Sequence, residues 1–232
     1  MRMRSGNPVL RGVANQTNVS DKPVTYSNVA YKSIFLIALV FVSAYTTIYL
    51  AQSLSIGILI GAFVMGFVSV IIGTRSVRLS PYFAVLYALC EGVVLAIVSA
   101  LFNTMSEGIV PTALITTVIV FIIMLLLYTT RVIKVTQRFA SIMVVALISV
   151  IIMSLLSFIL QPLSGGLYYV VVIISAGLSA FFLLLDFRSI ESCVESGTDS
   201  SYGWILSLGL LVTLVWIYIE MLRLLAIISR RR

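Results

Sequence analysis

The chain has 232 residues, of which 61% are hydrophobic and only 10% are charged, and its mean hydropathy is +1.17. About a quarter of the residues in a soluble domain are charged and under half are apolar, so this composition excludes an ordinary soluble protein. The excess of 15 basic over 8 acidic residues forms no basic stripe with stacking aromatic residues, so we expect no nucleic-acid binding. Histidine is absent from the sequence, which excludes zincin-type metal sites, Ser-His-Asp catalysis and an imidazole pH switch.

Apolar runs of about 20 residues recur along the chain and predict an all-α integral membrane protein, a bundle of seven transmembrane helices. We expect a polar N-terminal tail over residues 1–31, a transmembrane domain over 32–229 and a basic C-terminal tail over 230–232. The lipid bilayer is therefore the first partner that the sequence predicts. The expected spans are 33–51, 54–73, 82–102, 109–129, 139–160, 167–187 and 204–228.

Small and turn-forming residues mark several positions within this frame. Ser80 followed by Pro81 predicts a helix N-cap and a first helical position at the start of the third span. Gly57 with Gly61, and Ser175 with Ser179, are spaced four apart, which is typical of close helix–helix contact in membranes. We interpret both pairs as packing motifs rather than as ligand sites.

The distribution of Lys and Arg predicts the orientation in the membrane. The N-terminal segment and the second, fourth and sixth connections together carry eleven of these residues. The other side carries none in its connections and only the three arginines of residues 230–232. Cytoplasmic loops are rich in Lys and Arg, so the N-terminus is expected in the cytoplasm and, with seven spans, the C-terminus outside. A last span that is re-entrant or broken near Thr213 would instead return the C-terminus to the cytoplasm.

Three carboxylates fall within the predicted spans, where an ionisable group is costly and is a functional candidate. At about 1.5 Å per residue, Glu91 lies about 15 Å beyond Pro81, near the bilayer midplane, and Glu220 lies about 24 Å beyond Trp204. Asp186 closes the sixth span at its inner edge. If their helices adjoin, the three line a polar route for a hard cation such as Ca²⁺, with Asp186 and Glu91 as transient ligands, or for protons.

Each carboxylate also has a purely structural interpretation. Asp186 could simply mark the point where its helix meets water, with Arg188 as its neighbour. Glu220 and Arg223 are three residues apart and could neutralise each other on one helix. Glu91 could accept a hydrogen bond from Tyr87, four residues earlier.

Catalysis and a loop cation site are less favoured. Glu191, Glu195 and Asp199 are spaced four apart after the sixth span, and we interpret them as a solvated helix face rather than as a weak cation vestibule. Aspartyl intramembrane proteases need two aspartates within their spans, and only Asp186 qualifies here, so we expect no enzyme and no cofactor.

Four stretches of the chain resemble a known family. LLLDFRSIE and LVTLVWIYIEMLRLL are similar to the sixth and seventh spans of the Bax inhibitor-1 family, the transmembrane Bax inhibitor motif proteins. RSGNPVL near the N-terminus and LYALCEGVVLAIVS in the third span resemble a bacterial branch of that family. The resemblance implies a seven-helix bundle whose last helix is central and surrounded by the other six, in a bacterial inner membrane.

The resemblance also implies a pH-sensitive Ca²⁺ leak channel with an aspartate pair as its proton sensor. Asp186 matches the first aspartate of that pair, whereas Thr213 stands where the second is expected. Two aspartates at close range cannot both ionise cheaply, so with threonine the proton sensitivity has to come from burial or from another acid.

Three hypotheses follow. In the first, the protein is a Ca²⁺ leak in which ionised Asp186 holds Arg78 or Arg75 and keeps the route shut, and protonation releases that contact. In the second, the protein is non-conducting and modulates a membrane protease or a stress response through its N-terminal tail and acidic sixth loop. In the third, it is a proton-coupled exchanger.

Overall fold

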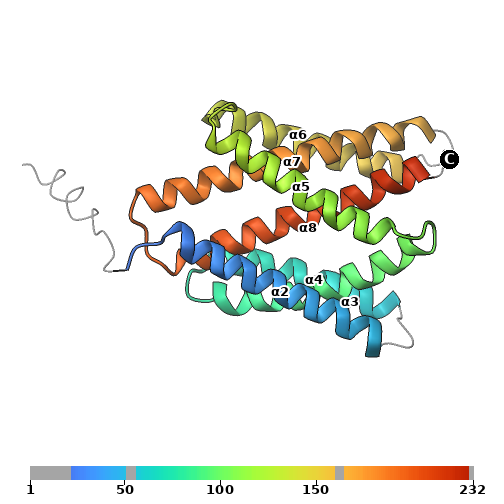
Figure 1. Cartoon of the computed structure of the whole chain (residues 1–232), viewed down its shortest axis with the longest axis horizontal. Coiled ribbons are helices and arrows are strands. Elements are labelled where there is room, and N and C mark those ends of the chain that lie inside the picture. Colours follow the sequence, from blue (N-terminus) through green and yellow to red (C-terminus); the bar gives the residue numbers. More distant parts are fainter. Residues whose placement is uncertain (1–21, 51–55, 160–164, 230–232) are drawn as a thin grey trace, which may run out of the picture.

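The computed structural model describes residues 22–50, 56–159 and 165–229 of the chain. Seven α-helices account for nearly all of these residues (Figure 1), and the described part contains no β-strand, only one isolated bridge between Pro23 and Asp199. The helices are α2 (Tyr26–Leu50), α3 (Ile56–Arg75), α4 (Ser80–Asn103), α5 (Ile109–Thr129), α6 (Gln137–Ile159), α7 (Gly165–Glu195) and α8 (Tyr202–Ser229). Each of the seven is long and apolar enough to cross a bilayer, so the predicted number and class of helices are confirmed.

Two helices extend beyond their predicted bounds. α2 begins at Tyr26, within the segment predicted as a polar tail, and α7 continues to Glu195 rather than ending near residue 187. Both extensions are polar, which is why an apolar run does not reveal them. Ser80 is the first residue of α4 and its hydroxyl makes no hydrogen bond, so the predicted Ser80 cap is wrong and Leu79 occupies that position. Residues 1–21 of the expected tail and residues 230–232 lie outside the described residues.

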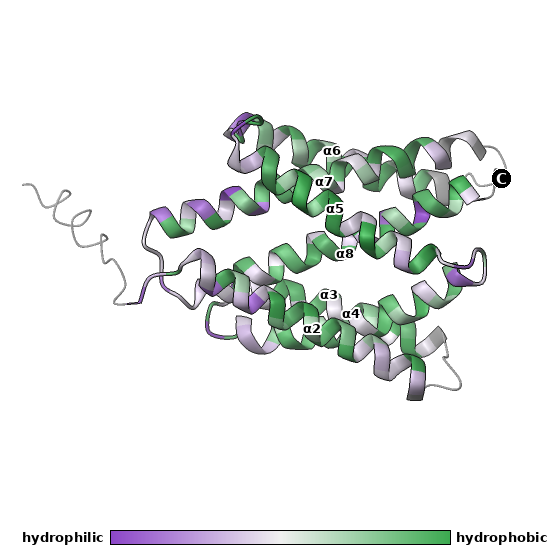
Figure 2. Cartoon of the chain, in the orientation of Figure 1, coloured by the Kyte–Doolittle hydropathy of each residue, from purple (hydrophilic) through white to green (hydrophobic). Residues whose placement is uncertain are grey.

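The helices run in alternating directions, so α2 begins at one end of the bundle and α8 finishes at the other (Figure 1). Polar residues gather near the two ends, and hydrophobic residues fill the middle of every helix (Figure 2). We call the end where α2 begins the basic end, because it carries all but one of the basic residues in the described part of the chain. These are Lys22, Lys32, Arg75, Arg78, Arg131, Lys134, Arg138 and Arg188.

α8 lies between two groups of helices. α2, α3 and α4 pack on one side of it, and α5 and α7 pack on the other (Figure 1). α6 packs against α7 and, within the described residues, makes no contact with α8. The expectation that six helices surround the last one therefore fails at α6, which lies outside the ring of helices that touch α8.

The segment before α2 is fastened to the connection between α7 and α8. The Val24 amide donates to the Thr198 carbonyl at 2.7 Å, and the Ser200 amide donates to the Lys22 carbonyl at 2.9 Å. The Lys32 ammonium donates to the Ser200 carbonyl at 2.7 Å. These long-range bonds hold the starts of α2 and α8 together at the basic end.

One close helix crossing joins α2 to α4. A β-carbon placed on Gly92 of α4 would lie 2.5 Å from the Ser43 β-carbon and 2.6 Å from the Val40 carbonyl oxygen of α2. The Ser43 hydroxyl donates to the Leu89 carbonyl at 2.6 Å. Gly61, which the Gly57–Gly61 spacing predicts at a helix contact, has no atom within 4 Å of its β-carbon position, so that part of the prediction is wrong.

Candidate functional site

Asp186 and Thr213 meet where α7 packs on α8. The Thr213 side chain is 6% exposed and is a neighbour of the Asp186 carboxylate. Its hydroxyl also donates to the Gly209 carbonyl at 3.3 Å, which is a long bond. Asp186 Oδ1 is 3.9 Å from the position of a β-carbon on Gly209, and Asp186 Oδ2 is buried without any hydrogen-bond partner. The structure therefore places side by side the two positions that the resemblance pairs.

In the part of the chain that the structure describes, no basic side chain forms an ion pair with Asp186. Arg75 and Arg78 are exposed at the end of α3 and just beyond it, and neither forms an ion pair or hydrogen bond with the carboxylate in the described structure. The predicted contact from Arg78 or Arg75 to Asp186 is therefore wrong for this conformation. Asp186 also does not mark the end of its helix, because α7 continues for nine residues, or about 14 Å, beyond it.

Glu91 lies at a different helix contact. Tyr87 is 5% exposed and lies next to the Glu91 side chain on the same face of α4. Glu91 Oε2 is 3.8 Å from the β-carbon position of Gly66, which places the carboxylate against α3. Tyr87 and Glu91 both lie against Gly66, so they belong to the contact between α3 and α4, and the hydrogen bond between them stays a prediction.

Glu220 is held in a local ion pair. The residue is 2% exposed, and its Oε1 atom accepts from Arg223 at 3.2 Å, from Trp216 at 3.1 Å and from Ser175 at 2.7 Å. Ser175 comes from α7, so this cluster also joins α7 to α8. The structural interpretation, in which Arg223 neutralises Glu220, is confirmed.

The three carboxylates do not line one interior route in this structure. Measured along their helices, Glu91 and Asp186 both lie about 14 to 16 Å from the basic end, and Glu220 lies about 27 Å from it. The sequence predicts three different depths for these carboxylates, whereas the structure places them at two. Between Asp186 and Glu220, Leu183 and Ile217 are fully buried, and the rings of Phe182 and Trp216 pack edge to face at 5.5 Å.

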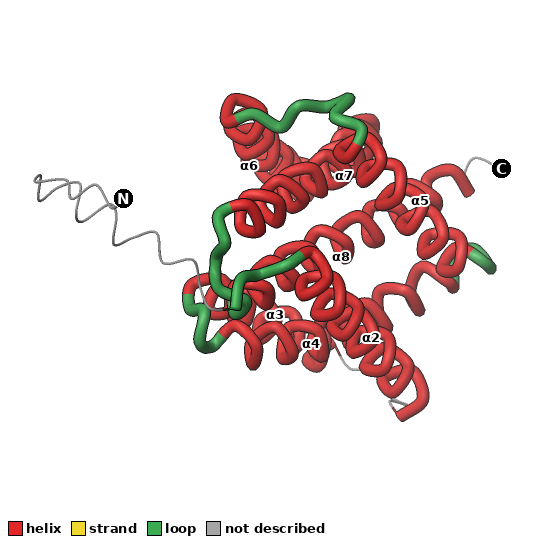
Figure 3. Tube along the Cα trace, turned by 60° about the vertical axis from the view of Figure 1, so that its left-hand side comes forward, coloured by secondary structure: helices red, strands yellow, loops and turns green. Residues whose placement is uncertain are grey.

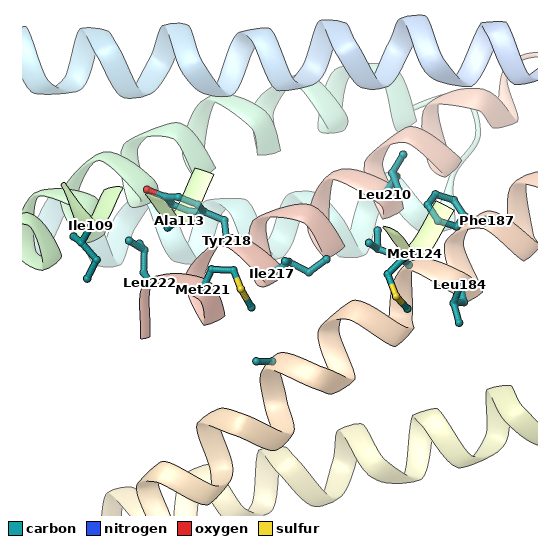
Figure 4. Close-up of a cluster of buried hydrophobic side chains, with 12 residues drawn as sticks. Ile109, Ala113, Met124, Leu184, Phe187, Leu210, Ile217, Tyr218, Met221 and Leu222 are labelled. Atoms are coloured by element: carbon teal, nitrogen blue, oxygen red, sulfur yellow. The ribbon is translucent and has the colours of Figure 1, made fainter. Parts of the chain in front are cut away.

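This apolar layer is part of the larger core. Ile217 of α8 packs in one cluster with Leu184 and Phe187 of α7 and with Met124 of α5 (Figure 4). Such packing leaves no continuous polar path along α7 and α8. An apolar layer therefore separates Asp186 from Glu220 in the described structure.

A partly open cavity of about 1470 Å³ lies elsewhere in the bundle, and we call it the α2–α5 groove. Its walls come from α2 and α5, whose described residues do not contact each other, and its floor comes from α4 and α8. Figure 3 shows α2 and α5 separated, with α8 behind the gap. Asp186, Glu91 and Glu220 are all absent from its lining.

Glu191 is a partly buried acid, although it was predicted as part of a solvated face. Its side chain is only 13% exposed, and it accepts from Arg131 at 3.1 Å and from Arg188 at 3.3 Å. Tyr128 of α5 also donates a hydrogen bond to it. The Arg188–Glu191 spacing of three could have suggested one of these contacts, whereas Tyr128 is 63 residues away in sequence. Glu195 and Asp199 are exposed, as predicted.

Among the described residues, no three acidic or cysteine side chains come together in a way that could hold a metal ion. Asp186 and Glu91, which the sequence nominates as transient Ca²⁺ ligands, belong to separate helix contacts.

Comparison with known proteins supports the resemblance seen in the sequence. The sequence profile of the family described as Bax inhibitor 1 like matches residues 7–230, which is nearly the whole chain. A search of curated proteins finds no match. The matched region contains all seven helices and the Asp186–Thr213 contact. The chain belongs to the Bax inhibitor 1 like family.

Proposed function

We propose that this protein is a passive cation pathway, with Ca²⁺ as the permeant ion, and that the proton on Asp186 controls whether α7 and α8 stay packed. The observation that carries this proposal is the enclosed Asp186 Oδ2 atom, which has no hydrogen-bond partner and no basic neighbour. An ionised carboxylate without a partner is costly away from water. The neutral acid is therefore the form that suits this packing.

The direction of the pH effect follows from this environment. Raising the pH removes the proton, and the ionised Asp186 then needs water or a cation beside it. The packed conformation loses stability relative to any arrangement in which α7 and α8 admit water. We therefore propose that flux rises with pH. If protonation of Asp186 instead released a bound arginine and opened the route, flux would fall as the pH rises. The proposal does not use that mechanism, because Arg78 is not in contact with Asp186 in the described structure.

Opening has to disrupt the apolar layer between Asp186 and Glu220. Leu183 and Ile217 fill the contact between α7 and α8 at this level, so a route past Asp186 needs these helices to separate. Arg223 would continue to neutralise Glu220 during this movement. Glu91 lies against α3 and takes a structural role in this proposal.

We further propose that the basic end faces the cytoplasm of a bacterial cell, because short cytoplasmic loops are rich in Lys and Arg. The protein then needs no cofactor and catalyses no covalent reaction. Its ligands are protons and the permeant ion.

Ca²⁺ flux into liposomes that contain the purified protein tests the proposal. We expect wild-type flux to be higher at about pH 8 than at about pH 6, with a change of at most about tenfold per pH unit for a single proton. Asp186→Asn keeps the shape and cannot ionise, so its flux should stay low at both pH values. Glu195→Gln, on the exposed part of α7, is the matched control and should behave as the wild type does.

Each alternative gives a different result. Equal pH dependence in wild type and Asp186→Asn would contradict the gating proposal. Absence of flux under every condition would favour a non-conducting protein that modulates a partner such as a membrane protease. Accumulation of Ca²⁺ against its gradient, driven by a pH difference, would favour an exchanger.

A further inference from the structure

We propose that the α2–α5 groove binds one anionic membrane phospholipid, with its acyl chains along the apolar walls and its phosphate at the basic end beside Arg131 and Lys134. This inference concerns a binding site and does not depend on ion conduction. Shape, charge and an unpaired hydroxyl in the groove each support it.

The shape of the groove suits a long, flexible, apolar ligand. Its volume of about 1470 Å³ is larger than the roughly 300–1,000 Å³ of sites for small molecules. Its rims are exposed, with Ile34 of α2 at 63% and Val118 of α5 at 56%. Leu211, Leu214 and Val215 of α8 form much of the floor. Because the rims do not touch, the groove opens sideways to the acyl chains of the surrounding bilayer.

Charge selects the headgroup. Three basic residues, Arg131, Lys134 and Arg188, and one acid, Glu191, line the basic end of the groove, which leaves a net positive charge there. Arg131 and Arg188 share Glu191, whereas exposed Lys134 has no ion pair or hydrogen bond within the described structure. Basic pockets between transmembrane helices attract anionic lipid headgroups. A phosphate at this position would have Lys134 as its uncommitted cation.

The Ser33 hydroxyl has no hydrogen-bond partner and is placed to donate to an ester carbonyl of the lipid. Ser33 of α2 lines the groove, is 5% exposed, and its Oγ atom has no hydrogen-bond partner. It lies seven residues into α2, about 10 Å from the start of the helix. The interfacial layer of a bilayer is about 5–8 Å thick, so the ester carbonyls of a lipid with its phosphate near Arg131 fall close to this depth. One of these carbonyls would accept from Ser33.

The deep end of the groove needs no polar ligand. Ser99 of α4 and Tyr218 of α8 both line it, and their hydroxyls hydrogen-bond to each other at 2.7 Å. Among the described residues that line the groove, the buried polar atom without a partner is Ser33 Oγ, which lies toward the basic end. This polarity gradient matches a lipid that enters with its chains first.

Native mass spectrometry tests this site on the full-length protein in detergent. The protein is mixed with phosphatidylglycerol and phosphatidylcholine that carry the same acyl chains. We expect the wild type to retain phosphatidylglycerol in preference. Lys134→Gln should weaken that retention about fivefold, the effect of one basic residue near an anionic headgroup. Arg138→Gln removes one charge at the same end but outside the groove, and should leave retention unchanged.

A second variant distinguishes the effect of filling the groove from the effect of removing the Lys134 charge. Ala30→Trp places a ring in the groove from an exposed position on α2, and it should reduce retention of both lipids. If this variant fails to fold, the comparison of Lys134→Gln with Arg138→Gln still decides. Equal retention of the two lipids by the wild type would overturn the proposal, as would equal effects of these two charge variants. Displacement of the bound lipid by inorganic phosphate alone would also overturn the proposal. So would the finding that two protein chains form a dimer that closes the groove.

Discussion

Asp186 of α7 faces Thr213 of α8, and one oxygen of the aspartate is enclosed there without a partner. The Thr213 hydroxyl donates its hydrogen bond to the Gly209 carbonyl at 3.3 Å. A single carboxylate therefore supplies the only ionisable group at this contact among the described residues. This arrangement differs from a pair of acids, which share a proton because both cannot ionise cheaply.

Thr213→Asp should convert the site into such a pair. The two acids can keep one proton between them, so full ionisation of the contact moves to higher pH. We expect the pH at which Ca²⁺ flux changes to rise by on the order of one unit or more. Thr213→Val, which removes the hydroxyl and keeps the shape, is the control. A flux midpoint in Thr213→Asp that is equal to or below that of the control would contradict this account.

Arg223 should matter for stability more than its exposure suggests. Removing it in Arg223→Met leaves Glu220 buried without a base, which we expect to lower the free energy of unfolding by about 2 kcal/mol. This loss is smaller than for a fully buried ion pair, because the Arg223 side chain is 42% exposed and solvent screens its charge. The double variant with Glu220→Met should recover part of this loss, and unfolding in mixed detergent micelles measures both. A double variant no more stable than Arg223→Met would show that the charge was not the cause.

Gly92→Ala should disrupt the crossing of α2 and α4. Its β-carbon would lie 2.5 Å from that of Ser43 and 2.6 Å from a backbone oxygen, so one helix has to move. Forcing an extra methyl group into a packed contact costs about 1–3 kcal/mol. Gly61→Ala, with nothing within 4 Å, should leave the unfolding temperature unchanged. Equal unfolding temperatures for the two variants would mean that this close approach does not exist.

Glu191 should hold the end of α5 against α7. Glu191→Ala removes the acceptor for Tyr128, Arg131 and Arg188, and we expect a loss of about 1–2 kcal/mol of local stability. Hydrogen exchange over residues 128–136 should then become several times faster. Glu195→Ala, one turn further along α7 and exposed, should not change it. Unchanged exchange in Glu191→Ala would mean that these contacts do not restrain the loop.

The sequence predicts the seven spans well, because a bilayer requires about 20 apolar residues in each. It fails where a helix leaves the hydrocarbon region. Arg188, Glu191 and Glu195 end the apolar run of α7 but do not end the helix, since Glu and Arg are good helix formers. The meeting of Asp186 with Thr213 was accessible only through the family resemblance, because nothing in residue spacing pairs positions on two different helices.

Other features could not be predicted for related reasons. Gly61 and Gly92 look alike in sequence, yet only Gly92 lies under another helix. Small residues permit a close crossing, but they do not say which face of the helix is covered. The α2–α5 groove depends on two helices that do not touch, and hydropathy along the chain carries no information about such a gap.

Infrared difference spectroscopy across a pH titration, with the wild-type spectrum compared with that of Asp186→Asn, tests the central claim most directly. The carbonyl stretch of a protonated carboxylic acid should be present at low pH in the wild type and absent from the variant. This signal should disappear over the same pH range in which Ca²⁺ flux rises. An Asp186 that is already ionised in the non-conducting protein, or flux that rises while its proton remains bound, would contradict the account.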